Sequence, residues 1–151
     1  RYGTVTGVQT CALPIWHHPT EVAATLAAAR QVGGRVLVVF QPHRYTRTVA
    51  LQQEFGACFT DADLAFVMDV YAAGEAPLPG ISGRTVVEAA QAQGASHVSY
   101  TPTAADATAA VLAAARPGDL VLTLGAGDVS KLGDALLAGL RTTGAGAGGT
   151  R

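Results

Sequence analysis

Short apolar runs alternate with longer helical segments between residues 19 and 140, and this alternation constrains the fold more than any other feature. The predicted strands are residues 35–40, 64–70, 97–100 and 120–124, and the predicted helices are residues 19–32, 49–60, 84–93, 103–115 and 129–140. Strands that alternate with helices of about 10–15 residues imply parallel strands joined by crossover helices. We therefore predict an α/β fold, a Rossmann-like, doubly wound, mostly parallel sheet with helices on both faces.

Composition narrows the class of protein. The chain has 151 residues, 49% of them apolar, and a formal net charge of −1. This length suits one domain with a substantial core, and the charge balance provides no basic surface for nucleic acid or a membrane. No apolar run is long enough for a transmembrane helix, and the two cysteines lack metal or redox spacing. We expect a cytoplasmic protein with neither nucleic-acid nor membrane partners.

The two ends of the chain differ from its middle. Residues 1–16 resemble translated sequencing-adapter read-through, so we expect a non-native N-terminal segment there. The alternative is a genuine edge strand at residues 4–9. Residues 142–151 are rich in glycine and alanine without apolar periodicity, which favours a flexible tail. The domain itself is predicted to cover residues 17–141.

Two arginines follow the first predicted strand. Its apolar residues 36–40 lead directly into Gln-Pro-His-Arg-Tyr-Thr-Arg at residues 41–47. A buried parallel strand with this sequence delivers Arg44 and Arg47 to the carboxyl edge of the sheet, where α/β proteins bind ligands. Two guanidinium groups three residues apart can share one carboxylate or phosphate. The alternative is a pair of solvated surface arginines.

Residues His17 and His18 precede the first predicted helix. Adjacent residues do not share a helix face, so this pair is a poor metal site. His18 is either a helix cap or a ligand contact, whereas His17 lies further out and is the better ligand-contact candidate. Asp69 ends an apolar run, and its carboxylate either pairs with an arginine of the previous loop or accepts backbone N–H groups.

Residues 125–128, Gly-Ala-Gly-Asp, separate the last predicted strand and helix. Such a turn resembles a weak anion cradle, but Ser130 stands where a dinucleotide fingerprint requires glycine. Asp128 is expected to cap the helix, which would discourage an anion. Lys131 is either a solvated residue or a phosphate ligand. No catalytic triad or carboxylate pair is evident, so the sequence predicts no self-contained active site.

Four strings make residues 17–140, about four-fifths of the chain, resemble the C-terminal domain of the Mur ligase family, in its alanine-adding branch. They are His-His-Pro-Thr-Glu at residues 17–21, Phe-Gln-Pro-His-Arg-Tyr-Thr-Arg at 40–47, Asp-Val-Tyr-Ala-Ala-Gly-Glu at 69–75 and Leu-Gly-Ala-Gly-Asp at 124–128. Their order and spacing agree with the family, and the Pro-His-Arg-Tyr-Thr-Arg string is the most specific.

The resemblance implies a reaction in which ATP phosphorylates the carboxylate of UDP-N-acetylmuramate and L-alanine attacks the acyl phosphate. Mg²⁺ would stabilise the transferring phosphoryl group. By the same resemblance, His17, Arg44 and Arg47 would hold the L-alanine carboxylate with His43 beside them. Asp69 and Tyr71 are candidates for supporting this site. ATP and Mg²⁺ would be bound mainly by N-terminal and central domains that this sequence lacks, and those domains would be its partners.

The sequence departs from the family immediately before the two histidines. The family has Asp-Asp-Tyr-Ala there, and its second acid helps to bind ATP, whereas this chain has Leu-Pro-Ile-Trp at residues 13–16. We expect this nucleotide contact to be lost, a strand to be replaced, and the chain to be an inactive fragment by itself. Two alternatives stay open: a non-catalytic α/β module that binds an anion or a partner, and a family member that adds glycine or serine.

Overall fold

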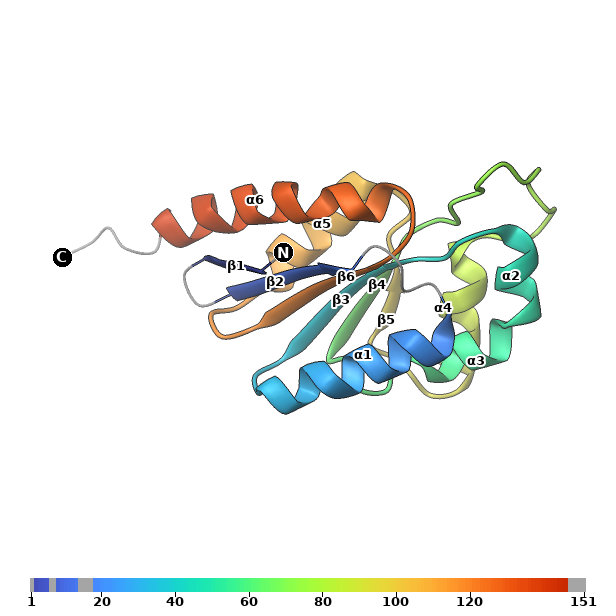
Figure 1. The fold of residues 1–151 in the computed structure, drawn as a ribbon, viewed down its shortest axis with the longest axis horizontal. Coiled ribbons are helices and arrows are strands. Elements are labelled where there is room, and N and C mark those ends of the chain that lie inside the picture. The colour runs from blue at the N-terminus through green and yellow to red at the C-terminus, as the bar shows by residue number, and fades with distance from the viewer. Residues whose placement is uncertain (1, 6–7, 14–17, 147–151) are drawn as a thin grey trace.

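A computed structural model describes residues 2–5, 8–13 and 18–146 of the chain, with side chains from residue 18 to residue 142. Its elements, in chain order (Figure 1), are β1 (Tyr2–Val5), β2 (Val8–Leu13), α1 (Pro19–Val32), β3 (Val36–Gln41), α2 (Tyr45–Ala50), α3 (Gln52–Ala57), β4 (Leu64–Val67), α4 (Gly83–Ala92), β5 (Val98–Tyr100), α5 (Ala104–Ala114), β6 (Leu120–Gly125), the 3-10 helix η1 (Asp128–Lys131) and α6 (Leu132–Gly146).

The strands form one six-stranded sheet in the order β1-β2-β6-β3-β4-β5. Five strands, β2, β6, β3, β4 and β5, are parallel to one another. Strand β1 lies at the edge of the sheet and pairs with β2 in antiparallel orientation. The prediction of a mostly parallel α/β sheet is therefore confirmed. Every residue of β3 and β6 is buried, as expected for central strands covered on both faces.

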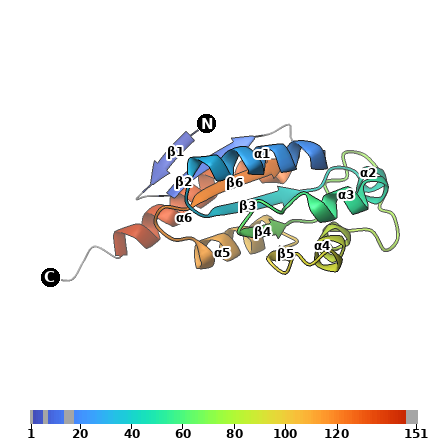
Figure 2. The ribbon, with the colours of Figure 1, turned by 90° about the horizontal axis from the view of Figure 1, so that it is seen from below.

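Helices cover the two faces of the sheet in separate layers (Figures 1 and 2). Helices α1, α3 and α4 pack on one face, where Phe40 of β3 meets the rings of Phe55 and Phe59 at centroid distances of 5.4 and 5.7 Å. Helices α5 and α6 pack on the other face, against Leu37 and Val39 of the same strand. Since successive strand residues point to opposite faces, β3 contributes to both halves of the core.

Three predicted boundaries were wrong. The helix predicted at residues 49–60 is two short helices, because Leu51 leaves the helical conformation (φ −112°, ψ 21°) between α2 and α3. Strand β4 ends at Val67, and beyond it an isolated bridge between His43 and Tyr71 joins the chain to the loop after β3. The last helix runs to Gly146 instead of residue 140, as a continuation of the turns anchored by buried Leu136 and Leu140.

The described part of the N-terminal segment contributes two strands. Strand β2 lies beside β6 in parallel register, with Thr10 opposite Val121, and β1 returns antiparallel to it. The predicted alternative was an edge strand at residues 4–9, whereas the structure places an inner strand at Val8–Leu13. That residues 1–16 are foreign, and that the domain proper covers residues 17–141, stay predictions.

Arg35 and Asp119 form a partly buried ion pair at the amino-terminal edge of the sheet. Asp119, whose side chain is 4% exposed, accepts from Nη2 of Arg35 at 2.8 Å and from the Arg116 backbone nitrogen at 2.8 Å. Burial by itself raises the pKa of this carboxyl. The hydrogen bonds from Arg35 and Arg116 outweigh that effect, so the pKa of Asp119 lies below its ordinary value of 3.8.

This pair predicts a loss of stability in acid. Because the pKa is lower in the folded state, the stabilisation is complete above the ordinary pKa and disappears as pH falls through the folded value. Asp119→Asn should lower the free energy of unfolding by about 2 kcal/mol at neutral pH and flatten its decline below about pH 4. Urea denaturation measures both. Asp128→Asn is the control, because its pair with Lys131 is 3.6 Å long and exposed. Equal losses in the two variants would contradict this account.

Candidate functional site

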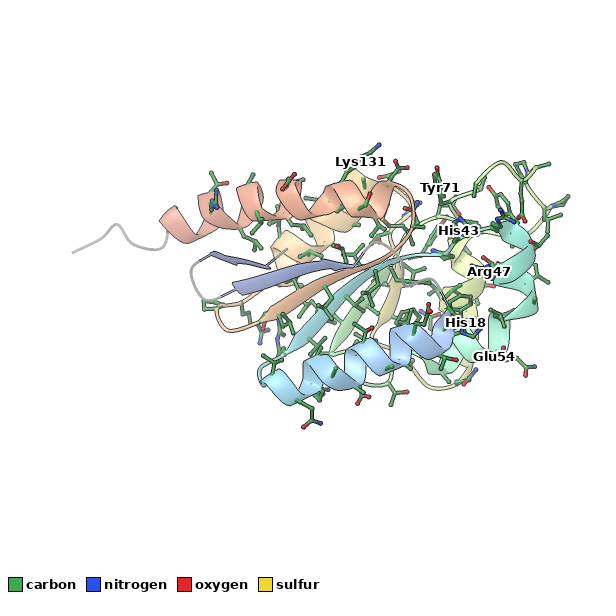
Figure 3. The ribbon with its side chains drawn as sticks, viewed as in Figure 1. His18, His43, Arg47, Glu54, Tyr71 and Lys131 are labelled. Atoms are coloured by element: carbon green, nitrogen blue, oxygen red, sulfur yellow. The ribbon has the colours of Figure 1, made fainter. Side chains whose placement is uncertain are left out.

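Three loops meet at the carboxyl edge of the sheet, where β3, β4 and β6 end side by side. Figure 3 shows His43, Tyr71, Arg47 and His18 at this end of the molecule. In open parallel sheets this edge is the usual place for a ligand. The candidate site is therefore built from the loop after β3, the loop after β4, the glycine turn after β6 and the start of α1.

The loop after β3 forms a strained turn, residues 42–47, that we call the arginine turn. Arg44 has a positive φ of 65°, which is unusual for a residue other than glycine, asparagine or aspartate. Its backbone nitrogen donates to the Tyr71 carbonyl at 2.8 Å, and the Tyr71 nitrogen donates to the Pro42 carbonyl at 2.8 Å. Such strain persists only where surrounding contacts hold it, and it is concentrated at functional sites.

Arg47 lies on α2, three residues after Arg44, which is the N-cap residue of that helix. Its Nη1 atom is buried and makes no hydrogen bond to any residue that the structure describes. A buried donor without an acceptor is unfavourable, and a guanidinium group is suited to a planar carboxylate or phosphate. Arg47 therefore has a donor atom that no described protein group satisfies.

His43 and Tyr71 join the first two loops. Their rings are stacked with a centroid distance of 6.1 Å and an interplanar angle of 26°. The Tyr71 ring also lies against Gly127 of the third loop, where an added Cβ would stand 2.4 Å from the ring. With φ at 98°, Gly127 has a conformation that favours glycine as well. Tyr71 therefore occupies the space above the glycine turn, which sequence reasoning treated as a weak anion cradle.

Gln41 is a site residue whose role the sequence analysis missed. Its side chain, 5% exposed, donates to the Asp69 carbonyl at 3.3 Å and accepts from the Val129 nitrogen at 2.9 Å. One buried amide therefore ties the ends of all three loops together. The signal that was available is a polar residue at the end of an otherwise apolar buried run, since such a residue needs partners.

Asp69 accepts backbone N–H groups, which was one of the two predicted alternatives. Its Oδ1 atom accepts from the nitrogens of Val70 and Gly83, each at 2.9 Å. Burial is the main cause that raises the pKa of Tyr100, and the nearby Asp69 carboxylate raises it further. None of the ion pairs among the described residues joins Asp69 to an arginine. Asp69 therefore fixes the start of α4 and the loop that carries Tyr71.

His18 acts as the N-cap of α1. Its Nδ1 accepts from the Thr20 nitrogen at 3.3 Å, and Glu21 accepts from the His18 nitrogen at 3.2 Å. This reciprocal pair satisfies two N–H groups at the helix start. His17, the preferred histidine of the sequence analysis, lies outside the described residues.

Asp128 differs from the sequence-based expectation, whereas Lys131 agrees with one of its two alternatives. Asp128 makes no cap, because the N-cap position of η1 is occupied by Gly127, which has no side chain to accept an N–H group. Lys131 is 83% exposed and lies 3.6 Å from Asp128, which agrees with the solvated alternative. Within the described ranges, no group of three or more histidine, cysteine or acidic residues is arranged to hold a metal ion. No helix among those residues is long and apolar enough to cross a membrane.

Comparison with known proteins gives consistent matches. The family model described as Mur ligase, glutamate ligase domain, matches residues 5–127, including part of the segment predicted to be foreign. The UDP-N-acetylmuramate–L-alanine ligase of Myxococcus xanthus is 53% identical over 128 residues, which are 84% of this chain and 27% of that protein. The ligase of the same name from Mycobacterium sp. strain JLS is 49% identical over 144 residues, 92% of this chain and 29% of that protein.

The chain thus spans less than a third of the length of these curated relatives. Among solved structures, a murein peptide ligase of Psychrobacter arcticus matches with a TM-score of 0.74 at 19% identity, over 92% of this chain and 28% of that chain. At that identity the likeness concerns the fold.

Proposed function

This chain belongs to the Mur ligase family, and from that premise we propose that it is the amino-acid-binding C-terminal domain of an alanine-adding ligase. The complete enzyme would join L-alanine to UDP-N-acetylmuramate in peptidoglycan synthesis, in the cytoplasm, using ATP. Curated relatives of that name, at about 50% identity, support the choice of substrate.

The single observation that carries the proposal is the buried Nη1 of Arg47, which has no acceptor among the described residues, beside the strained Arg44. A guanidinium fork there would bind the carboxylate of L-alanine through charge-assisted hydrogen bonds. His43 would line the same site, and His17 is proposed as a further contact. Tyr71 and Asp69 would support the loops, as their packing and hydrogen bonds suggest.

Holding the carboxylate would place the amine of L-alanine for attack on an acyl phosphate. Positioning of this kind turns a bimolecular step into one that resembles an intramolecular reaction. Closure of this domain over the other two would exclude the water that hydrolyses an acyl phosphate. The described residues do not fit a Mg²⁺ site, so we assign ATP and Mg²⁺ to the N-terminal and central domains of the ligase.

The test is a hybrid ligase in which residues 18–146 of this chain replace the matching part of the Myxococcus xanthus relative. With UDP-N-acetylmuramate, ATP and Mg²⁺ present, ADP release should depend on L-alanine. Glycine and L-serine, tested in the same assay, decide which first residue is added. A folded hybrid whose ADP release is indifferent to all three amino acids would count against the assignment.

The 151-residue chain alone is expected to be inactive. It spans only 27–29% of its relatives, and the described part has no group of three or more histidine, cysteine or acidic residues that could hold a metal ion. The measurement is ADP release by the isolated chain under the conditions used for the hybrid. Alanine-dependent turnover by the isolated chain would refute the division of roles proposed here. Saturable anion binding without any turnover in the hybrid would instead favour a non-catalytic binding module.

A further inference from the structure

Hydrogen bonds from the loop of residues 71–75 hold the arginine turn in place. The Tyr71 carbonyl accepts from the Arg44 nitrogen at 2.8 Å. The Glu75 carboxylate accepts from the Thr46 nitrogen at 3.1 Å and from the Thr46 hydroxyl at 2.5 Å. Thr46 lies between Arg44 and Arg47, so these hydrogen bonds fix the backbone of the segment that carries both guanidinium groups.

Helix α2 depends on these hydrogen bonds because so short a helix is not stable by itself. It has six residues, and its N-cap, Arg44, makes no side-chain capping bond. A helix of that length is unstable by itself, and its first N–H groups require acceptors. Glu75, which is 29 residues away in sequence, supplies the acceptor that a local cap would provide. The direction of the Arg47 side chain therefore depends on a carboxylate from another loop.

The charge of Glu75 fits this role. Its pKa lies below the ordinary value, chiefly because the Thr46 hydroxyl donates to it, and the nearby Arg44 lowers it further. Glu75 is therefore ionised at neutral pH, and both of its oxygens have acceptor roles toward Thr46. An ionised carboxylate would repel the carboxylate of an amino acid, so Glu75 is suited to holding the turn and not to binding the ligand itself.

We propose that Glu75 is a positioning residue that sets the geometry of Arg44 and Arg47 for a substrate carboxylate. The proposal rests on the proposed function, because it takes the arginine turn as the carboxylate site. It adds a residue with no ligand contact whose loss should weaken amino-acid binding.

The experiment compares Glu75→Gln with a matched control in the 151-residue chain. Asp106, within the capping box of α5, contacts the same two groups of a threonine: its Oδ2 accepts from the Thr103 nitrogen at 3.2 Å and from the Thr103 hydroxyl at 2.6 Å. Asp106→Asn therefore weakens a comparable carboxylate–threonine contact at the start of a helix that carries neither arginine. L-alanine is titrated while NMR follows the side-chain Nε–H signal of Arg47. Amide hydrogen exchange at Thr46 is measured without L-alanine.

Glu75→Gln is expected to weaken L-alanine binding about three- to tenfold and to speed amide exchange at Thr46. Asp106→Asn should leave L-alanine binding unchanged although it weakens a comparable carboxylate–threonine contact. Thr46→Val, which deletes only the hydroxyl contact, should give a smaller loss of binding than Glu75→Gln. Unchanged binding in Glu75→Gln, or an equal loss in Asp106→Asn, would overturn the positioning role.

Failure of the proposed function has a separate signature. If the unmodified chain shows no saturable shift with L-alanine, the carboxylate site is refuted in this chain. The exchange data then decide the structural part of the proposal by themselves. Unchanged Thr46 exchange in Glu75→Gln would overturn it, and faster exchange would support Glu75 as the residue that holds the turn.

Discussion

Arg47→Ala is expected to raise the KM for L-alanine at least about tenfold in the hybrid ligase, with a smaller change in kcat. The substitution removes a charged fork whose Nη1 is buried and has no acceptor among the described residues. A hydrogen bond to a charged group contributes about 1.5–3 kcal/mol, which corresponds to about tenfold or more in affinity. Arg44→Ala should act in the same direction. Steady-state kinetics with L-alanine as the varied substrate measures both.

Two further variants sharpen this test. Arg47→Lys keeps the charge but loses the planar fork, so it should recover only part of the affinity. Arg30→Ala is the matched control, because Arg30 lies in the last turn of α1 and pairs with Asp63 at 2.6 Å. Its KM for L-alanine should equal that of the unmodified hybrid. An unchanged KM in both Arg44→Ala and Arg47→Ala would refute their role as carboxylate ligands.

Gly125→Ala is expected to destabilise the fold by more than about 3 kcal/mol. At Gly125, φ is 116°, and an added Cβ would stand 2.3 Å from the Gln41 carbonyl oxygen and 3.0 Å from its backbone nitrogen. Both are main-chain atoms of the neighbouring strand, paired with Gly125 in the sheet, so neither can move aside cheaply. Chemical denaturation of the 151-residue chain measures the loss.

Gly94→Ala separates backbone strain from the collision. Gly94 has a φ of 90°, but an added Cβ there would meet nothing within 4 Å. Its replacement should therefore cost only the conformational strain of a left-handed residue, about 1–2 kcal/mol. If the two variants lose the same stability, the close approach between β6 and β3 is not what requires glycine at residue 125.

The sequence predicts the α/β architecture well because the pattern that encodes it is local. The apolar run of β3 acts on its near neighbours in the chain. The same is true of the proline and glycine residues at the two ends of α1. The position of the arginine turn was predicted by the same reasoning, since the carboxyl ends of parallel strands lie at one edge of the sheet. The capping role of His18 was also within reach, because it depends on residues two and three positions away.

The rest of the site depends on contacts that no local pattern contains. Gln41 bonds to residues 28 and 88 positions away, and Glu75 reaches back 29 positions to Thr46. The choice between an arginine partner and backbone partners for Asp69 depended on how α4 is placed, which only the packed structure determines. The break at Leu51 could not be predicted from the sequence either, because the residues immediately beside it favour a helix.

The position of β6 has a consequence for how the chain folds. The last strand in the sequence lies between β2 and β3, and its pairing with β3 joins Val36 to Leu120. During synthesis, β3 is therefore made long before the neighbour that covers its edge exists. Non-local parallel pairing of this kind slows folding and leaves an unpaired apolar strand edge in the nascent chain. The edge of β3 facing β6 is therefore where a chaperone would be needed, or where aggregation would begin, until synthesis passes residue 125.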